Sequence, residues 1–458
     1  MKRTESNTYY LEEAPIKKAI AHLSIPMMLG MSAGTIYNII NAIFIGQVHD
    51  TAMLSAITLG LPIFAVLMAV GNVFGVGGGT FITRLVAKRE GELAKRVAGY
   101  SFYGGMIISL LIAIVAYFSI IPLVHLLGAD AVTFDYTRKY ALTLFVGGFA
   151  IVTNFALEQL VRSEGASKES MYGMIVSISL SIIFDFLFIL ILDWHVIGAA
   201  LSMIFANIGS TVYYVWYLDS KSDHLKGFLH HFKLNAKNQM EVFKIGVSEL
   251  FQTFFLIITT LLLNHYSMEY GDHVVAGFGI ALRIAQLPEF LSMGLFFGII
   301  PFIAYNFSSK NISRLKSVIK HAAIYIGVIS GTFLGIVYLF KVPVIQLFTT
   351  DSSVLHIGVY IVGAMLISAL FNGFTGLFTG IFQASGEGMS AIIMAVTQGL
   401  LYIPVVITLH HFFGLHGVVW SMTITEVLTC TIGLSLFFFY AKKLSRIENE
   451  GVQVSKPS

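Results

Sequence analysis

Long apolar segments recur from one end of the 458-residue chain to the other. A helix that spans a bilayer needs about 20 predominantly apolar residues, so this pattern predicts an integral membrane protein. The composition agrees, because 56% of the residues are hydrophobic and 12% are charged, whereas about 25% of a soluble domain is charged. The small net charge of +3 argues against nucleic acid as a partner, and the single cysteine excludes a disulfide framework.

Charged stretches and breaks marked by Gly or Pro divide the chain into twelve apolar segments. They predict an all-α fold with helices near 25–46, 53–82, 97–121, 136–160, 170–192, 197–218, 245–267, 275–305, 318–340, 354–380, 389–410 and 416–440. The 28 Lys and Arg fall almost entirely on one set of alternate loops. This bias predicts that both termini lie in the cytoplasm.

A weak internal repeat relates the two halves of the chain. Three pairs of segments carry it at a nearly constant separation: 125–130 with 346–351, 163–165 with 384–386, and 197–203 with 416–422. Six helices per half is an even number, so the repeat predicts two pseudo-symmetric six-helix bundles of the same topology. Such bundles typically enclose a cavity that opens alternately to each side, which favours a transporter over an enzyme.

The repeat also predicts the domain organisation. We expect an N-lobe over 1–218, a cytoplasmic linker over 219–244, a C-lobe over 245–440 and a cytoplasmic tail over 441–458. The linker is rich in lysine, and we expect it to be solvated and to contact anionic lipid headgroups.

Ionisable side chains at membrane depth are the main indication of function. Each costs about 2.5–3.5 kcal/mol at the centre of a helix unless it pairs or faces a cavity. Asp185 shares one helix face with Ser177 and Ser181, at spacings of four residues. Under the predicted orientation Asn41 lies at the same depth as Asp185, so we expect the two to share a site.

The other polar residues predict a water-filled cavity. Arg162 follows Glu158 by four residues, which favours a local ion pair, and the sequence leaves open whether Glu158 also titrates. Polar residues on several helices are better explained by a cavity for substrate than by packing alone. The candidate lining residues are Asn38, Asn154, Glu249, Arg283, Gln286, Glu289, Asn372, Gln383 and Glu426.

Several short motifs are spread over about residues 15–445. They are Leu23-Ser-Ile-Pro-Met-Met28, Phe74-Gly-Val-Gly-Gly-Gly-Thr80, Ala87-Lys-Arg-Glu-Gly91, Leu126-Leu-Gly-Ala-Asp130, Arg162-Ser-Glu-Gly165, Ile183-Phe-Asp185, Gly198-Ala-Ala-Leu-Ser202, Ile300-Pro-Phe-Ile-Ala-Tyr-Asn306 and Gln383-Ala-Ser-Gly386. Together these motifs resemble those of the multidrug and toxic compound extrusion (MATE) family, and most closely its MepA-like exporters of Gram-positive bacteria.

This resemblance implies two lobes of six helices and export of drugs in exchange for H⁺ or Na⁺. In many members an Asp on helix 1 and an Asp on helix 5 bind the coupling ion. Asp185 matches the helix-5 position, whereas the helix-1 position is Asn41. Ser181 stands where many members have Asn, and Ser202 adjoins the helix-6 position. Glu158 is a second candidate for the ion, including Na⁺, and no cofactor is implied.

We therefore predict a secondary transporter that exports small lipophilic cationic drugs by antiport with H⁺. Na⁺ is less favoured, because it needs several oxygen ligands whereas a proton needs one buried carboxylate. We expect a monomer in a bacterial cell membrane, with membrane lipids as its other partners. The first alternative, a lipid-linked oligosaccharide flippase, would need a cationic cavity, but membrane-depth carboxylates outnumber arginine here. The second, an intramembrane enzyme, has no catalytic constellation to support it.

Overall fold

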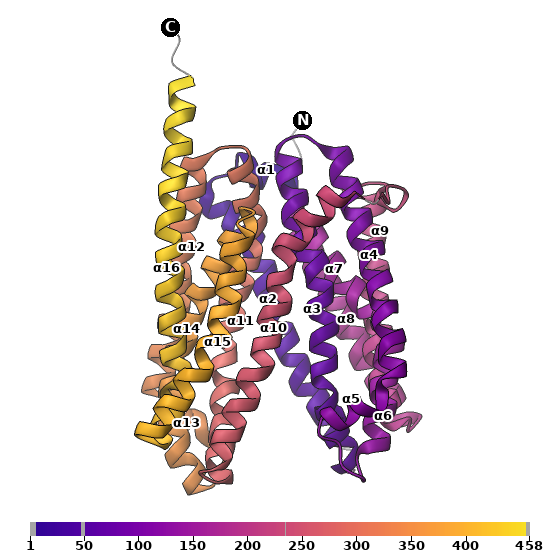
Figure 1. The fold of residues 1–458 in the computed structure, drawn as a ribbon, viewed down its shortest axis with the longest axis vertical. Coiled ribbons are helices and arrows are strands. Elements are labelled where there is room, and N and C mark those ends of the chain that lie inside the picture. Colours follow the sequence, from indigo (N-terminus) through magenta and orange to yellow (C-terminus); the bar gives the residue numbers. More distant parts are fainter. Residues whose placement is uncertain (1–5, 47–50, 234, 455–458) are drawn as a thin grey trace. The chain divides into compact units, whose positions relative to one another are not determined.

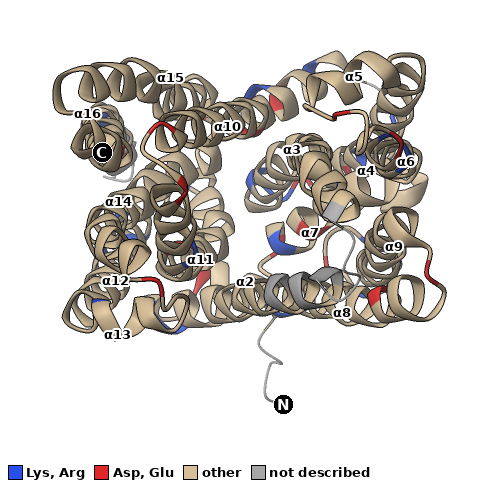
Figure 2. Cartoon of the chain, turned by 90° about the horizontal axis from the view of Figure 1, so that it is seen from below, with Lys and Arg blue, Asp and Glu red and all other residues tan. Residues whose placement is uncertain are grey.

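The computed structural model describes residues 6–46, 51–233 and 235–454, and nearly all of these residues are helical (Figure 1). Eleven of the described helices are long and apolar enough to cross a membrane, and one bent pair of helices makes a twelfth span. The predicted all-α membrane fold is therefore confirmed. Charged residues occupy few positions along the ribbon (Figure 2).

The chain forms two compact units. Unit 1 contains Met1–Leu11 and Leu29–Thr253, and unit 2 contains Glu12–Met28 and Phe254–Ser458. Two long helices, α2 (Ile16–Gly46) and α10 (Ala236–Met268), each contribute to both units. The predicted lobe boundaries differ from these units at 12–28 and 245–253, and the division at 219–244 stays a prediction.

The remaining helices fall within one unit or the other, apart from the last residue of the first helix, Glu12, which belongs to unit 2. Those of unit 1 are α1 (Asn7–Glu12), α3 (Thr51–Ala87), α4 (Gly91–Phe118), α5 (Ile120–Leu126), α6 (Phe134–Val146), α7 (Gly148–Ser163), α8 (Ser167–Asp185), the π-helical η1 (Phe186–Ile191), α9 (His195–Ser220) and the 3₁₀ turn η2 (Phe228–His230). Those of unit 2 are α11 (Asp272–Ser308), α12 (Ile312–Leu339), α13 (Lys341–Gln346), α14 (Ser352–Ala384), α15 (Gly388–Phe413) and α16 (Leu415–Val454).

The helix predicted at 136–160 is bent. Its two parts, α6 and α7, meet at an angle of 51° on either side of Gly147. Glycine pairs are a common cause of kinks, and Gly148 follows Gly147 directly. A Cβ atom on Gly147 would lie 2.2 Å from Cδ1 of Ile204, so the close approach of α9 also requires glycine there.

The internal repeat is visible in the helix boundaries. Helices α3, α4 and α8 begin at Thr51, Gly91 and Ser167, and α11, α12 and α15 each begin 221 residues later. The short α5 and α13 occupy corresponding places after α4 and α12. The two halves therefore share one order of helices.

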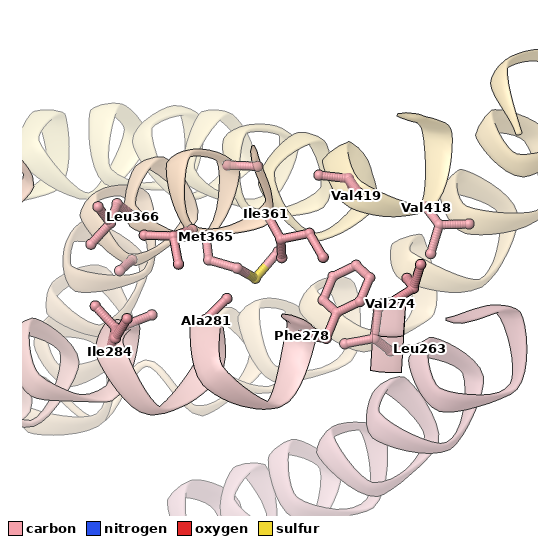
Figure 3. Close-up of a cluster of buried hydrophobic side chains, with 14 of the residues drawn as sticks. Leu263, Val274, Phe278, Ala281, Ile284, Ile361, Met365, Leu366, Val418 and Val419 are labelled. Carbon is pink, nitrogen blue, oxygen red and sulfur yellow. The ribbon is translucent and has the colours of Figure 1, made fainter. Parts of the chain in front are cut away.

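A cluster of apolar side chains packs the interior of unit 2 (Figure 3). Phe278, Ala281 and Ile284 of α11 recur along one helix face and meet Ile361 and Met365 of α14. Because lipid is as apolar as these side chains, van der Waals packing holds such helices together. The same packing positions the polar groups of α11 and α14.

The linker is more tightly packed than we expected. It leaves α9 at Ser220 and reaches α10 at Ala236, and its Leu225 and Phe228 side chains are fully buried. The expectation of a solvated segment is therefore wrong for these two residues. It holds for the lysines, which are exposed: Lys221, Lys226, Lys233, Lys237 and Lys244.

Candidate functional site

Asp185 is the most deeply buried carboxylate that the sequence singled out. It is 0% exposed, and two neutral groups donate hydrogen bonds to its Oδ2 atom. The Tyr37 hydroxyl donates at 3.0 Å and Nδ2 of Asn41 donates at 2.9 Å. The other carboxylate oxygen, Oδ1, is buried and has no hydrogen-bond partner in the described part of the chain. The expectation that Asn41 and Asp185 lie together is therefore met.

Local helix geometry presents Asp185 to this site. It is the last residue of α8, and the π-helical η1 follows it directly. Such wider turns inside helices are frequent at functional sites. One turn earlier, the backbone carbonyl of Ser181 accepts a hydrogen bond of 3.1 Å from the Ser202 hydroxyl of α9. This bond ties α8 to α9 beside the carboxylate.

Glu158 has different partners. Its Oε1 atom lies 3.6 Å from Nη1 of Arg162, and both side chains are buried in α7. Arg162 also donates a hydrogen bond to Gln159 and interacts electrostatically with Glu249 of α10. The structure thus forms the predicted Glu158–Arg162 pair. No hydrogen bond or ion pair joins Glu158 to Asp185 within the described residues.

Unit 2 contains its own pair of carboxylates, of which Glu426 is buried and Glu289 is half-buried. Glu426 of α16 is 6% exposed and accepts hydrogen bonds from Nε2 of Gln398, at 2.6 Å, and from the Thr375 hydroxyl, at 3.3 Å. Glu289 of α11 lies near enough to interact electrostatically with Glu426. Neither carboxylate forms an ion pair with a basic residue among the residues that the structure describes. Their negative charge is therefore not balanced by the protein.

The other candidate residues occupy varied places. Asn154 of α7 is buried and its Oδ1 accepts a hydrogen bond of 2.5 Å from Ser210. Gln383 is buried and Asn372 is half-buried on α14, whereas Arg283 and Gln286 are exposed on α11. The side chain of Asn38 lies outside the described residues. No group of three or more His, Cys, Asp or Glu in the described ranges is arranged to hold a metal ion.

Comparisons with known proteins agree with this architecture. The model of the MatE family matches residues 26–187 and 245–408, which is more than half of the chain. The chain belongs to the MatE family of membrane transporters. The family resemblance predicted from the sequence motifs is therefore confirmed.

Individual relatives of this MATE chain cover almost all of it. It is 36% identical to the multidrug export protein MepA of Staphylococcus saprophyticus and 37% identical to MepA of Staphylococcus aureus. Each match covers 96% of this chain and 98% of the relative. A solved MATE structure in complex with MaD3S is 25% identical, has a TM-score of 0.89, and is matched over 98% of this chain and 100% of its own. The chain is thus a multi-span transporter and not an enzyme, as we predicted.

Tyr37 is the site residue of this MATE chain that sequence reasoning missed. It lies four residues before Asn41 on α2, and the amide of Asn41 also donates to its hydroxyl at 3.3 Å. Tyr140, 1% exposed, is a second missed neighbour that interacts electrostatically with Asp185. The one indication in the sequence was that Tyr37 lies four residues before Asn41, and therefore on the same face of the helix. A tyrosine in an apolar helix, however, usually indicates packing.

The pairing in α7 predicts a large effect of removing Arg162. In an Arg162→Gln variant the carboxylates of Glu158 and Glu249 lose their buried cation, so we expect a loss of about 3–5 kcal/mol of stability. Thermal unfolding of the purified protein in detergent measures this. The double variant Glu158→Gln/Arg162→Gln should recover part of the loss. Wild-type stability of Arg162→Gln would show that the pair is not a buried ion pair.

Proposed function

We propose that this MATE transporter exports lipophilic organic cations from a bacterial cell by exchange for an ion that binds at Asp185. The named relatives support the export of many drugs, since both are multidrug export proteins. The site supports the exchange, because Asp185 is a buried carboxylate with no basic partner in the described residues and with one unpartnered oxygen. This oxygen is the observation that carries the proposal.

A proton is the ion that fits this site best. Asn41 and Tyr37 both direct hydrogen-bond donors at Oδ2 of Asp185, whereas a Na⁺ site needs several oxygen lone pairs directed at the ion. Protonation of Oδ1 requires no rearrangement of these donors. It also removes the large cost of an unpaired charge buried away from water. We therefore propose H⁺ as the coupling ion, in preference to Na⁺.

The carboxylates of unit 2 support a cationic substrate. Glu289 and Glu426 repel each other when both are ionised, and a bound positive charge relieves this repulsion. A drug with one positive charge and an apolar body would suit this environment of buried apolar helices. We also propose a monomer with both termini in the cytoplasm, in contact with membrane lipids.

Removal of the Asp185 charge tests the exchange. Asp185→Asn keeps the size of the side chain but cannot bind and release a proton, so we expect the variant to insert and bind drug yet to export none. Drug susceptibility of a pump-deficient host measures export, and Asp135→Asn is the control because Asp135 is an exposed carboxylate of the same unit. Wild-type resistance conferred by Asp185→Asn would contradict the proposal.

Binding of dyes of opposite charge tests the substrate class. The purified protein should bind ethidium-like cations more tightly than anionic dyes of similar size. Glu289→Gln/Glu426→Gln should weaken cation binding by about a hundredfold or more, since it removes two charged contacts, each worth on the order of 1.5–3 kcal/mol, and about 1.4 kcal/mol corresponds to a tenfold change in Kd. Glu387→Gln, at a carboxylate that pairs with Lys443, is the control. Tighter binding of anionic dyes would reject a cationic substrate.

A further inference from the structure

A second buried carboxylate of unit 1 lies in the turn between α7 and α8. Glu164 is 2% exposed, and the linker between α9 and α10 packs against it. Its Oε1 atom accepts hydrogen bonds from the Ser222 hydroxyl at 2.5 Å and from the backbone N–H of His224 at 3.1 Å. Its Oε2 atom is buried and has no hydrogen-bond partner within the described ranges.

No positive charge compensates Glu164 in the described structure. The groups that face it are Asp223 and His224 of the linker and Tyr217 of α9, which also interacts with Glu169 of α8. The short helix α1 contributes only neutral contacts here. Its Thr8 hydroxyl lies 3.0 Å from Nε2 of His224, and its Asn7 amide donates to Tyr217 at 3.4 Å.

The internal repeat shows that this turn does not require a carboxylate. The residue 221 positions after Glu164 is Ser385, which follows α14 as Glu164 follows α7. Ser385 forms a hydrogen bond of 2.5 Å with the Tyr440 hydroxyl, so a neutral group satisfies the equivalent turn. The turn therefore does not need Glu164 for its structure, and burying the ionised Glu164 side chain costs free energy.

We propose that Glu164 is a proton-binding site, separate from Asp185, and that its protonation fastens the linker to the turn between α7 and α8. The neutral acid removes the unpaired buried charge while Oε1 still accepts from Ser222 and His224. Loss of the proton leaves Glu164 with a buried negative charge that no cation among the described residues balances, and this weakens the attachment of the linker to the turn. Because the linker leads directly into α10, the state of Glu164 changes how firmly the start of that helix is held.

The direction of the pH effect follows from the environment. Burial is the main cause that raises the pKa of Glu164 to about 7, from an ordinary value of 4.5. A raised carboxyl pKa means that the attached state binds more protons than the detached state. The extra stability that protonation of Glu164 gives to the attached linker is complete below about pH 4.5 and is lost as the pH rises through about 7. Burial lowers the pKa of His224, so His224 does not oppose this trend at neutral pH.

Hydrogen exchange of the linker tests this proposal. We would measure backbone exchange over 221–233 in the full chain, in lipid nanodiscs at pH 6 and pH 8, after correction for intrinsic exchange rates. If the detached state has the ordinary pKa, the opening equilibrium should rise about tenfold between these two pH values. The turn at 385–387 in unit 2 is the internal control and should show no such change. Equal protection of the linker at both pH values would overturn the proposal.

Three variants identify the group that titrates. Glu164→Gln should protect the linker equally at pH 6 and pH 8, because its amide is neutral and keeps an acceptor oxygen. Glu169→Gln and His224→Gln should both keep the tenfold pH effect. A pH effect that persists in Glu164→Gln, or disappears in His224→Gln, would overturn the assignment. Infrared difference spectra provide a second measurement: the carboxylic acid band lost between pH 6 and pH 8 should be smaller in Glu164→Gln than in the wild type, because one of the contributing carboxyls is removed, and a band of unchanged intensity would count against the proposal.

Discussion

The cost of a carboxylate buried away from water is the constraint on which the polar interior of this protein depends. The chain meets it in three ways. Glu158 pairs with Arg162, which also interacts with Glu249. Asp185 receives two neutral donors and retains an open oxygen. Glu426 receives donors from neighbouring helices but no positive charge in the described structure. In the part of the chain that the structure describes, only the first arrangement places a basic side chain beside the carboxylates, so the other two are suited to a mobile cation.

The sequence predicted the parts of this account that depend on local periodicity. The length of the apolar segments predicted the helices. The predicted orientation placed Asn41 and Asp185 at the same depth in the membrane, and this predicted that they share a site. Tyr37 could not be predicted in the same way. Its contact with Asp185 joins residues 148 positions apart, and the direction of a tyrosine hydroxyl depends on how two helices rotate against each other. The bend at Gly147 likewise depends on the approach of Ile204, which no local pattern encodes.

The internal repeat conserves the helix frame without conserving its charges. At the spacing of 221 residues that relates α8 to α15, the position of Asp185 is occupied by the buried Val406. In the same way the position of Glu164 is occupied by Ser385. A shared order of helices therefore supports a different chemistry in each half. This difference between the halves is consistent with our proposal that ion exchange takes place at Asp185 and that Glu289 and Glu426 compensate the charge of the substrate.

The most direct measurement of the central claim is drug efflux from proteoliposomes under separately imposed ion gradients. The account predicts efflux driven by a pH gradient at uniform Na⁺, and none from Asp185→Asn liposomes under the same gradient. Efflux driven by a Na⁺ gradient at uniform pH, and unchanged by a pH gradient, would contradict it.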